Sequence, residues 1–175
     1  RGMSYTPLGV DSAGQGVRAV AERRCQACSS ERSVLAALRE TTPNGKENFA
    51  ILPGAISREP LAPAVLRKDS EWATIIRWVL FALIEAEEQG VTSGNVRGLQ
   101  KETADPDLHW FLNSCGERGK ALGLKPDWVA DIIAAVGNYG EMYERNLGSA
   151  SALKLDRGLN RLWKDGGLLY APSFQ

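Results

Sequence analysis

The chemically most suggestive stretch of the chain is residues 25–35, CQACSSERSVL, which opens with a C-x-x-C pair. A redox pair of this spacing normally lies at the N-terminus of a helix, where the helix dipole lowers the pKa of the first thiol. Here Cys25 and Cys28 are predicted to lie in a short strand before the helix, and strand residues three apart point to opposite faces. This geometry disfavours a disulfide between them.

A metal or catalytic centre also lacks the residues it would need. A zinc site would require two more ligands, and the rest of the chain offers one histidine, His109, and one cysteine, Cys115. No G-x-S-x-G accompanies His109 for a serine hydrolase, and no glycine-rich phosphate-binding motif is present. We therefore expect no metal, no cofactor and no enzymatic activity.

The remaining polar group in this stretch consists of Ser29, Ser30 and Glu31. They fall where a strand is predicted to end and a helix to begin, and in open α/β sheets ligands bind at the carboxyl ends of strands. Two hydroxyls, free helix amides and one carboxylate could hold an ammonium group. The alternative is that Ser30 and Glu31 only cap the helix, where an acid suits the dipole; the local sequence by itself favours the cap.

The bulk composition narrows the class of protein. The chain has 175 residues, enough for a hydrophobic core. Lys plus Arg and Asp plus Glu are both 21, and this zero net charge argues against a nucleic-acid partner, which usually meets a basic surplus. The longest apolar run, ATIIRWVLFALIEA, contains Arg77 and is too short to cross a bilayer.

The pattern of apolar residues divides the chain near residue 65. Residues 1–55 follow a strand–helix–strand–helix–strand pattern, with strands at 4–10, 25–29 and 49–53 and helices at 12–24 and 31–40. We expect the second helix to be capped by Ser29 or Ser30. Residues 41–48 are predicted to form a turn. Residues 54–69 include Pro60 and Pro63 and are predicted to form an extended connection.

After residue 65 the chain is predicted to be nearly all helix. A long helix spans residues 70–88, capped by Asp69 or Ser70 and ended by Gly90. Further helical segments are predicted at 92–102, 105–113, 125–148 (starting at Pro126) and 156–167, before an extended tail. All five tryptophans fall in this part, and we expect them in the core. The acids of EAEEQG (Glu85, Glu87 and Glu88) are expected to form a solvated face.

Four longer stretches of the sequence are EPLAPAV, SEWATIIRWVLFALIEAEEQGVT, ALGLKPDWVADIIAAVGNYGEMYERNLG and RGLNRLWKDGGLLYAP. Together they resemble the C-terminal half of the periplasmic general L-amino-acid-binding proteins of ABC importers. The resemblance runs over nearly the whole chain. It implies an α/β fold, the C-terminal portion of a two-lobed type II binding protein, with a small sheet and flanking helices followed by a mostly helical half.

The resemblance also implies a division of the chain. Residues 1–56 would be part of the second lobe, residues 57–66 a hinge or crossover strand, and residues 67–175 the helical C-terminal part of the first lobe. The chain would then be roughly half of such a protein, which accounts for the change of composition near residue 65.

In proteins of this family an acid at the end of a second-lobe strand takes the α-amino group of the ligand. The motif places Glu31, with Ser30 beside it, at that position. Where the family commonly has Asp, Tyr and Gly, this chain has Glu31, Cys28 and Arg23. The family tends to carry a second cysteine near the start of the second lobe, so the resemblance implies a disulfide partner for Cys25 upstream of this chain.

The resemblance implies a periplasmic binding module that is not an enzyme. Such a module holds an L-amino acid in the cleft between two lobes and delivers it to the membrane subunits of an ABC permease. One alternative is a truncated, non-binding derivative that acts as an interaction or structural protein, with self-association through its exposed lobe surface. A second alternative is an enzyme derived from this scaffold, but beyond Glu31 the sequence offers no general acid or base.

Overall fold

The computed structural model describes residues 2, 4–57, 60–113 and 116–174. The chain divides into two compact units. Unit 1 comprises Arg1–Arg58 with Ala152–Leu155, and unit 2 comprises Glu59–Ser151 with Asp156–Gln175. None of the helices within the described residues has both the length and the hydrophobicity of a membrane-spanning segment.

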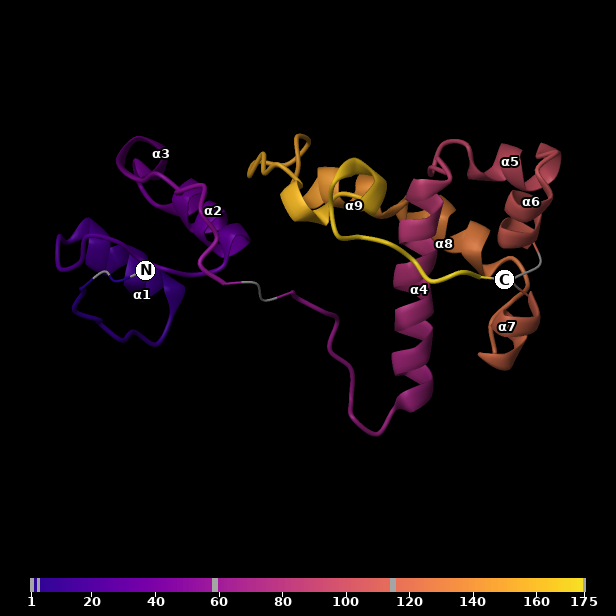
Figure 1. The fold of residues 1–175 in the computed structure, drawn as a ribbon, viewed down its shortest axis with the longest axis horizontal. Coiled ribbons are helices and arrows are strands. Elements are labelled where there is room, and N and C mark those ends of the chain that lie inside the picture. Colours follow the sequence, from indigo (N-terminus) through magenta and orange to yellow (C-terminus); the bar gives the residue numbers. More distant parts are fainter. Residues whose placement is uncertain (1, 3, 58–59, 114–115, 175) are drawn as a thin grey trace. The chain divides into compact units, whose positions relative to one another are not determined.

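The described residues of unit 1 form three helices joined by extended segments: α1 (Ala13–Ala21), α2 (Arg32–Thr41) and the short α3 (Gly45–Asn48) (Figure 1). Helix α1 begins as predicted, because the Ser12 hydroxyl accepts a hydrogen bond from the Gln15 amide at 3.3 Å. Helices α1 and α2 contact each other, and each contains an alanine that is 1% exposed, Ala19 in α1 and Ala36 in α2. The turn predicted at residues 41–48 contains α3.

The small sheet is not formed by the described residues of unit 1. The segments predicted as strands at 4–10, 25–29 and 49–53 contain no strand and follow irregular or extended paths. Their apolar side chains remain exposed, with Tyr5 at 78% and Leu52 at 76%. An extended segment becomes a strand only when its backbone groups pair with a neighbouring segment, and the described residues supply no such neighbour.

Unit 2 is built around α4 (Ser70–Glu88). Asp69 caps this helix by accepting a hydrogen bond from the Trp72 amide at 2.9 Å. Gly90, at φ +70°, ends it with a left-handed residue. Both ends agree with the sequence prediction.

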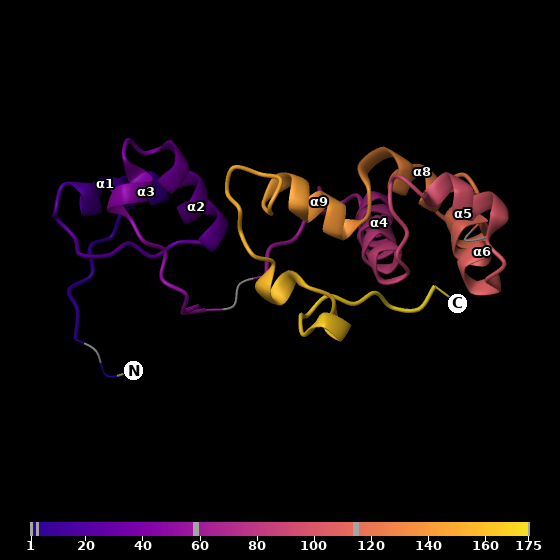
Figure 2. The same ribbon diagram turned by 90° about the horizontal axis from the view of Figure 1, so that it is seen from above.

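Shorter helices follow α4 along the chain: α5 (Val96–Glu102), α6 (Pro106–Asn113), α7 (Gly116–Ala121), α8 (Trp128–Val136) and α9 (Tyr139–Asn146). Helix α8 contacts α4, α5 and α6, and α9 contacts α4 (Figure 2). One apolar cluster forms the core, and its largest fully buried side chains are Leu112, Ile133, Val91, Val96 and Val129.

Three predictions for unit 2 were wrong in detail. The helix expected from Pro126 begins at Trp128 and ends at Gly137, whose φ of +80° breaks it before α9. The helix expected over 156–167 is instead two single turns of 3₁₀ helix, η1 (Gly158–Asn160) and η2 (Trp163–Asp165). Of the five tryptophans, Trp72 and Trp163 are 49% and 59% exposed rather than buried in the core.

Candidate functional site

The residues predicted to bind the ligand, Ser30 and Glu31, lie directly before α2. Glu31 occupies the N-cap position in an extended conformation, and its carbonyl oxygen accepts the Leu35 amide at 2.9 Å. The Glu31 side chain makes no capping hydrogen bond, and Ser29 and Ser30 do not occupy the cap position. The prediction that a serine caps this helix was therefore wrong, and Glu31 caps it through its backbone alone.

The Glu31 carboxylate is also available to solvent. Ser29, Ser30 and Glu31 are all exposed, and no hydrogen bond or ion pair joins the Glu31 carboxylate to another described residue. An ionised carboxylate with four lone-pair positions can accept several hydrogen bonds from an ammonium group. The first amides of α2 and the two hydroxyls add further polar groups at the same helix end.

The two cysteines of the C-x-x-C pair lie against α1. Both thiols are free, and the described residues contain no group of three metal-binding side chains. The Cys25 amide donates to the Ala19 carbonyl at 3.2 Å. A Cβ atom added at Gly16 would lie 2.6 Å from the Cys28 sulfur, so Cys28 packs directly on the surface of α1 at this glycine.

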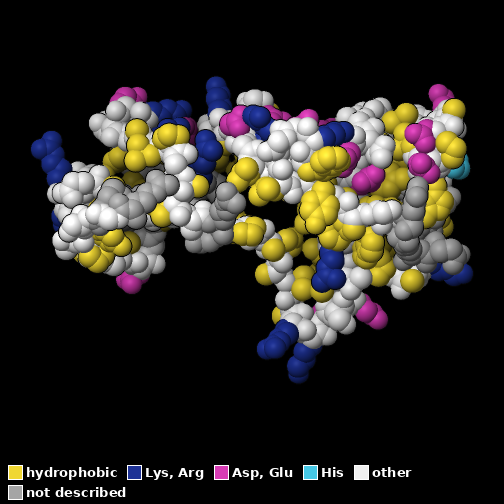
Figure 3. Space-filling view, in the orientation of Figure 1, with side chains coloured by type: hydrophobic (Ala, Val, Ile, Leu, Met, Phe, Trp, Pro, Cys, Tyr) yellow, Lys and Arg dark blue, Asp and Glu magenta, His cyan; other side chains and the backbone are white. Residues whose placement is uncertain are grey.

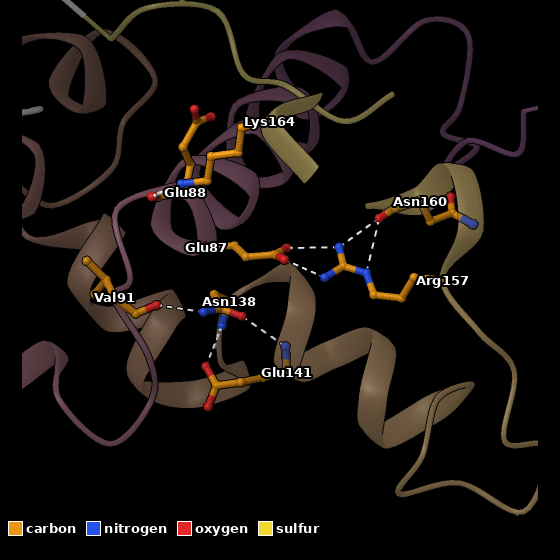
Figure 4. Close-up of polar contacts among 8 residues, drawn as sticks. All are labelled: Glu87, Glu88, Val91, Asn138, Glu141, Arg157, Asn160 and Lys164. Atoms are coloured by element: carbon orange, nitrogen blue, oxygen red, sulfur yellow. Dashed lines mark hydrogen bonds and ion pairs between the residues drawn. The ribbon is translucent and has the colours of Figure 1, made fainter. Parts of the chain in front are cut away.

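Unit 2 carries a polar framework that the sequence did not suggest (Figure 4). Arg157 forms a two-pronged ion pair with Glu87, and its Nη2 lies 3.0 Å from Glu87 Oε2. The same guanidinium donates to the Asn160 carbonyl at 2.7 and 3.1 Å and lies over the rings of Tyr139 and Tyr143, at 5.6 and 5.5 Å from their centroids. This one side chain joins α4, α9 and residues 156–174, which we call the C-terminal segment.

The pKa values of the neighbouring groups follow from this arrangement. Burial acts to lower the pKa of Arg157, but the hydrogen bonds and charge of Glu87 outweigh it and raise the pKa above its usual value. Burial raises the pKa of Tyr139, against the opposing charge of Arg157. Both groups are therefore fixed in charge at neutral pH, with Arg157 positive and Tyr139 neutral.

A second contact joins the end of α4 to the C-terminal segment. The last turn of α4 contains no basic residue, although the negative end of the helix dipole favours cations. Lys164 supplies one, because its Nζ donates to the Glu88 carbonyl oxygen at 2.7 Å, and Trp163 Nε1 donates to Glu88 Oε1 at 2.9 Å. The prediction of a solvated face was thus wrong for Glu87 and Glu88, which bind the C-terminal segment.

Asn138 holds the start of α9 against the loop after α4. Asn138 and Glu141 form a reciprocal capping box, and Asn138 Nδ2 donates to the Val91 carbonyl oxygen at 2.8 Å. Glu141 also accepts the Ser93 hydroxyl at 2.6 Å. Burial acts to raise the pKa of Glu141, but the hydrogen bonds from Ser93 and Asn138 outweigh it and lower the pKa below 4.5.

Sequence reasoning identified neither the Glu87–Arg157 pair nor the Asn138–Glu141 capping box. The N-x-x-E spacing of Asn138 and Glu141 is a capping-box pattern that could have been recognised. The pairing of Glu87 with Arg157 had no sequence signal, because the two residues are 70 positions apart. His109 is at the surface of α6; Cys115 lies outside the described residues.

Comparison with known proteins identifies several relatives. No family model matches the chain. The chain is 45% identical over 170 residues to YhdW of Escherichia coli strain K12, assigned as an amino-acid ABC transporter-binding protein. It is 40% identical over 173 residues to the glutamate/glutamine/aspartate/asparagine-binding protein BztA of Rhodobacter capsulatus and 44% identical over 172 residues to the general L-amino acid-binding periplasmic protein AapJ of Rhizobium johnstonii.

These alignments cover 97–99% of the chain but only 50–51% of the relatives. The chain therefore spans about half the length of the curated relatives it matches. Among solved structures, a periplasmic binding protein of an ABC transporter from Brucella ovis with glutathione bound superposes with a TM-score of 0.88 and 39% identity, covering 99% of this chain and 54% of that one.

The relatives are binding proteins and not enzymes, in agreement with the sequence prediction. The sequence identity and the superposition extend over nearly every residue of unit 1 and unit 2. Over nearly its whole length, and over about half of theirs, the chain is similar to periplasmic solute-binding proteins of amino-acid ABC transporters.

Proposed function

We propose that this chain is the C-terminal portion of the solute-binding component of an ABC importer for L-amino acids. It would work in the periplasm and deliver its ligand to the permease subunits in the membrane. The observation that carries the proposal is the match to BztA and AapJ, whose names describe amino-acid binding, over 97–99% of this chain.

The ligand would be held between two lobes, with Glu31 and Ser30 contacting its α-amino group. The exposed Glu31 carboxylate, which has no partner among the described residues, supports this role. A hydrogen bond to a charged group of this type is worth about 1.5–3 kcal/mol. The glutathione bound to the Brucella ovis relative fits the same chemistry, because its γ-glutamyl end carries a free α-amino and α-carboxylate pair.

The unpaired segments of unit 1 fit the same proposal. Residues 1–56 would form part of the second lobe, with strands at 4–10, 25–29 and 49–53 completed by the half of the relatives that this chain does not match. Residues 57–66 would be the hinge or crossover strand, and residues 67–175 would complete the first lobe.

Isothermal titration with a panel of L-amino acids and glutathione tests the proposal on two proteins: the 175-residue chain, and the same chain joined to the uncovered half of AapJ. We expect no binding by the chain alone, because half of the cleft is missing, and binding of at least one ligand by the joined protein. Micromolar binding by the chain alone would contradict the divided cleft. A joined protein that melts cooperatively yet binds nothing would contradict the function.

A second function is favoured by the exposed apolar side chains of unit 1 and the connection that follows it. Tyr5, Ile56 and Leu66 are 78%, 89% and 81% exposed, and contiguous surfaces of this type promote association. The chain could then act as a non-binding interaction protein that self-associates. Light scattering after size-exclusion chromatography separates the two, since a monomer at all concentrations would exclude self-association.

A further inference from the structure

A surface groove of about 700 Å³ lies within unit 2, between the last turns of α4, the first turns of α6 and the C-terminal segment. Its aromatic lining consists of Trp110, Phe111, Trp163, Tyr170 and Phe174. Trp163 and Tyr170 are 59% and 66% exposed, so ring surface is accessible along the groove. Figure 3 shows exposed hydrophobic side chains with acidic side chains among them on unit 2.

The charged side chains among the described lining residues of the groove are all acidic. Glu85, Glu88 and Asp107 line it, and no Lys, Arg or His is among its described lining residues. Glu88 Oε1 accepts Trp163 Nε1, and Glu85 Oε1 accepts Gln89 Nε2, each at 2.9 Å. Both donors are neutral, so these bonds orient the two carboxylates without cancelling their charge.

The basic side chain that follows the exposed indole in sequence is not among the residues that line the groove. Lys164 follows Trp163, but its ammonium donates to the Glu88 carbonyl oxygen and not to the carboxylate. Glu85 and Glu88 are half-buried, and a charge–charge interaction is stronger there than between fully solvated groups. The groove therefore favours a cation over an anion or a neutral group.

We infer that this groove binds an arginine side chain presented by a partner polypeptide. A guanidinium is planar, so one face can stack on an exposed indole while its edge donates hydrogen bonds to carboxylates. The groove offers both features together, with the Trp163 ring held beside the Glu88 carboxylate by their hydrogen bond. This site lies wholly in unit 2 and does not depend on Glu31 or on amino-acid binding.

Nuclear magnetic resonance of the full 175-residue chain tests this site. The five tryptophans give five indole N–H signals, which single Trp→Phe variants assign. The probe is acetyl-Gly-Arg-Gly-amide, with the citrulline peptide of the same shape as a neutral control. We expect the arginine peptide to shift the Trp163 and Trp110 signals saturably, and added salt to weaken the effect. An equal shift with the citrulline peptide, or no saturable shift with arginine, would overturn the inference.

A second experiment removes two negative charges from the groove and compares this variant with one that loses an acid elsewhere on the same helix. Glu85→Gln with Glu88→Gln keeps an oxygen acceptor for each neutral donor but removes both charges, and we expect affinity for the arginine peptide to fall about fivefold or more. Glu71→Gln changes an exposed acid in the first turn of the same helix and should leave affinity unchanged. An equal loss in both variants, with unchanged indole signals of the free proteins, would show a general charge effect and overturn the site.

Discussion

Arg157 and Glu87, separated by 70 positions in the sequence, form a two-pronged ion pair with both side chains largely buried, at 14% and 15% exposure. The pair fixes the C-terminal segment to α4, and Arg157 also donates to the Asn160 carbonyl and lies over two tyrosine rings. These contacts connect α4, α9 and the C-terminal segment, and no pattern in the sequence predicts them.

Replacing Arg157 by Gln should destabilise unit 2 by about 2–3 kcal/mol, because Glu87 would keep a largely buried charge without its partner. Tryptophan fluorescence during urea unfolding measures this unit alone, since all five tryptophans belong to it. Arg161→Gln is the control: its pair with Asp156 is 47% and 62% exposed, so its loss should cost less than about 1 kcal/mol. Equal effects of the two changes would contradict the assigned role of Arg157.

Asn138→Ala should destabilise unit 2 by about 2–4 kcal/mol, because it removes a helix cap and leaves the Val91 carbonyl oxygen without its donor. Asn138→Asp should lie between this variant and the wild type, since an aspartate can still accept from the Glu141 amide but cannot donate to Val91. Urea midpoints measure both. Asn146→Ala, which removes only an exposed bond within α9, should have little effect, and a loss as large as that of Asn138→Ala would count against the cap.

The stability of unit 2 should fall as the pH drops below about 4.5, in part through Glu141. Its pKa is lower in the folded chain, so the ionised carboxylate stabilises the fold above the unfolded pKa, and this contribution is lost as the pH falls through the folded value. Glu141→Gln should flatten the dependence of the urea midpoint on pH, whereas Glu102→Gln, at an exposed position, should not. Parallel curves for wild type and Glu141→Gln would refute the assignment.

The contact of Gly16 with Cys28 gives a paired prediction in unit 1. Gly→Ala within a helix normally stabilises it by about 1 kcal/mol, but here the new methyl group would collide with the Cys28 sulfur, and overpacking costs about 1–3 kcal/mol. Gly16→Ala should therefore fail to stabilise α1 in the wild type and should stabilise it in a Cys28→Ala background. Hydrogen exchange of the α1 amides measures both, and the same effect in both backgrounds would contradict the contact.

Glu31→Ala in the chain joined to the uncovered half of AapJ should weaken amino-acid binding about tenfold or more, because the ammonium group loses its counter-charge. Glu47→Ala, which removes an exposed acid from α3 in the same unit, should leave the affinity unchanged. Unchanged binding by Glu31→Ala in isothermal titration would reduce Glu31 to its backbone role at the start of α2.

Local signals in the sequence predicted much of the helical structure. The Asp69 cap, the apolar period over residues 70–88 and Gly90 placed α4 correctly, because caps and periodicity act within a few residues. The strands of unit 1 could not be judged in this way, because strand formation depends on neighbours that lie elsewhere in a protein. Glu31 stays a prediction from the family motif, and the structure adds its exposure.

The sequence by itself determined the resemblance to amino-acid-binding proteins and the helical character after residue 65, and it proposed Glu31 as the residue that holds an ammonium group. Only the tertiary structure decided that Glu87 and Glu88 bind the C-terminal segment, that Cys28 packs on Gly16, and that aromatic and acidic side chains meet in one groove. The reason is physical: caps and periodicity are local, whereas ion pairs and grooves depend on which distant segments the buried core brings together.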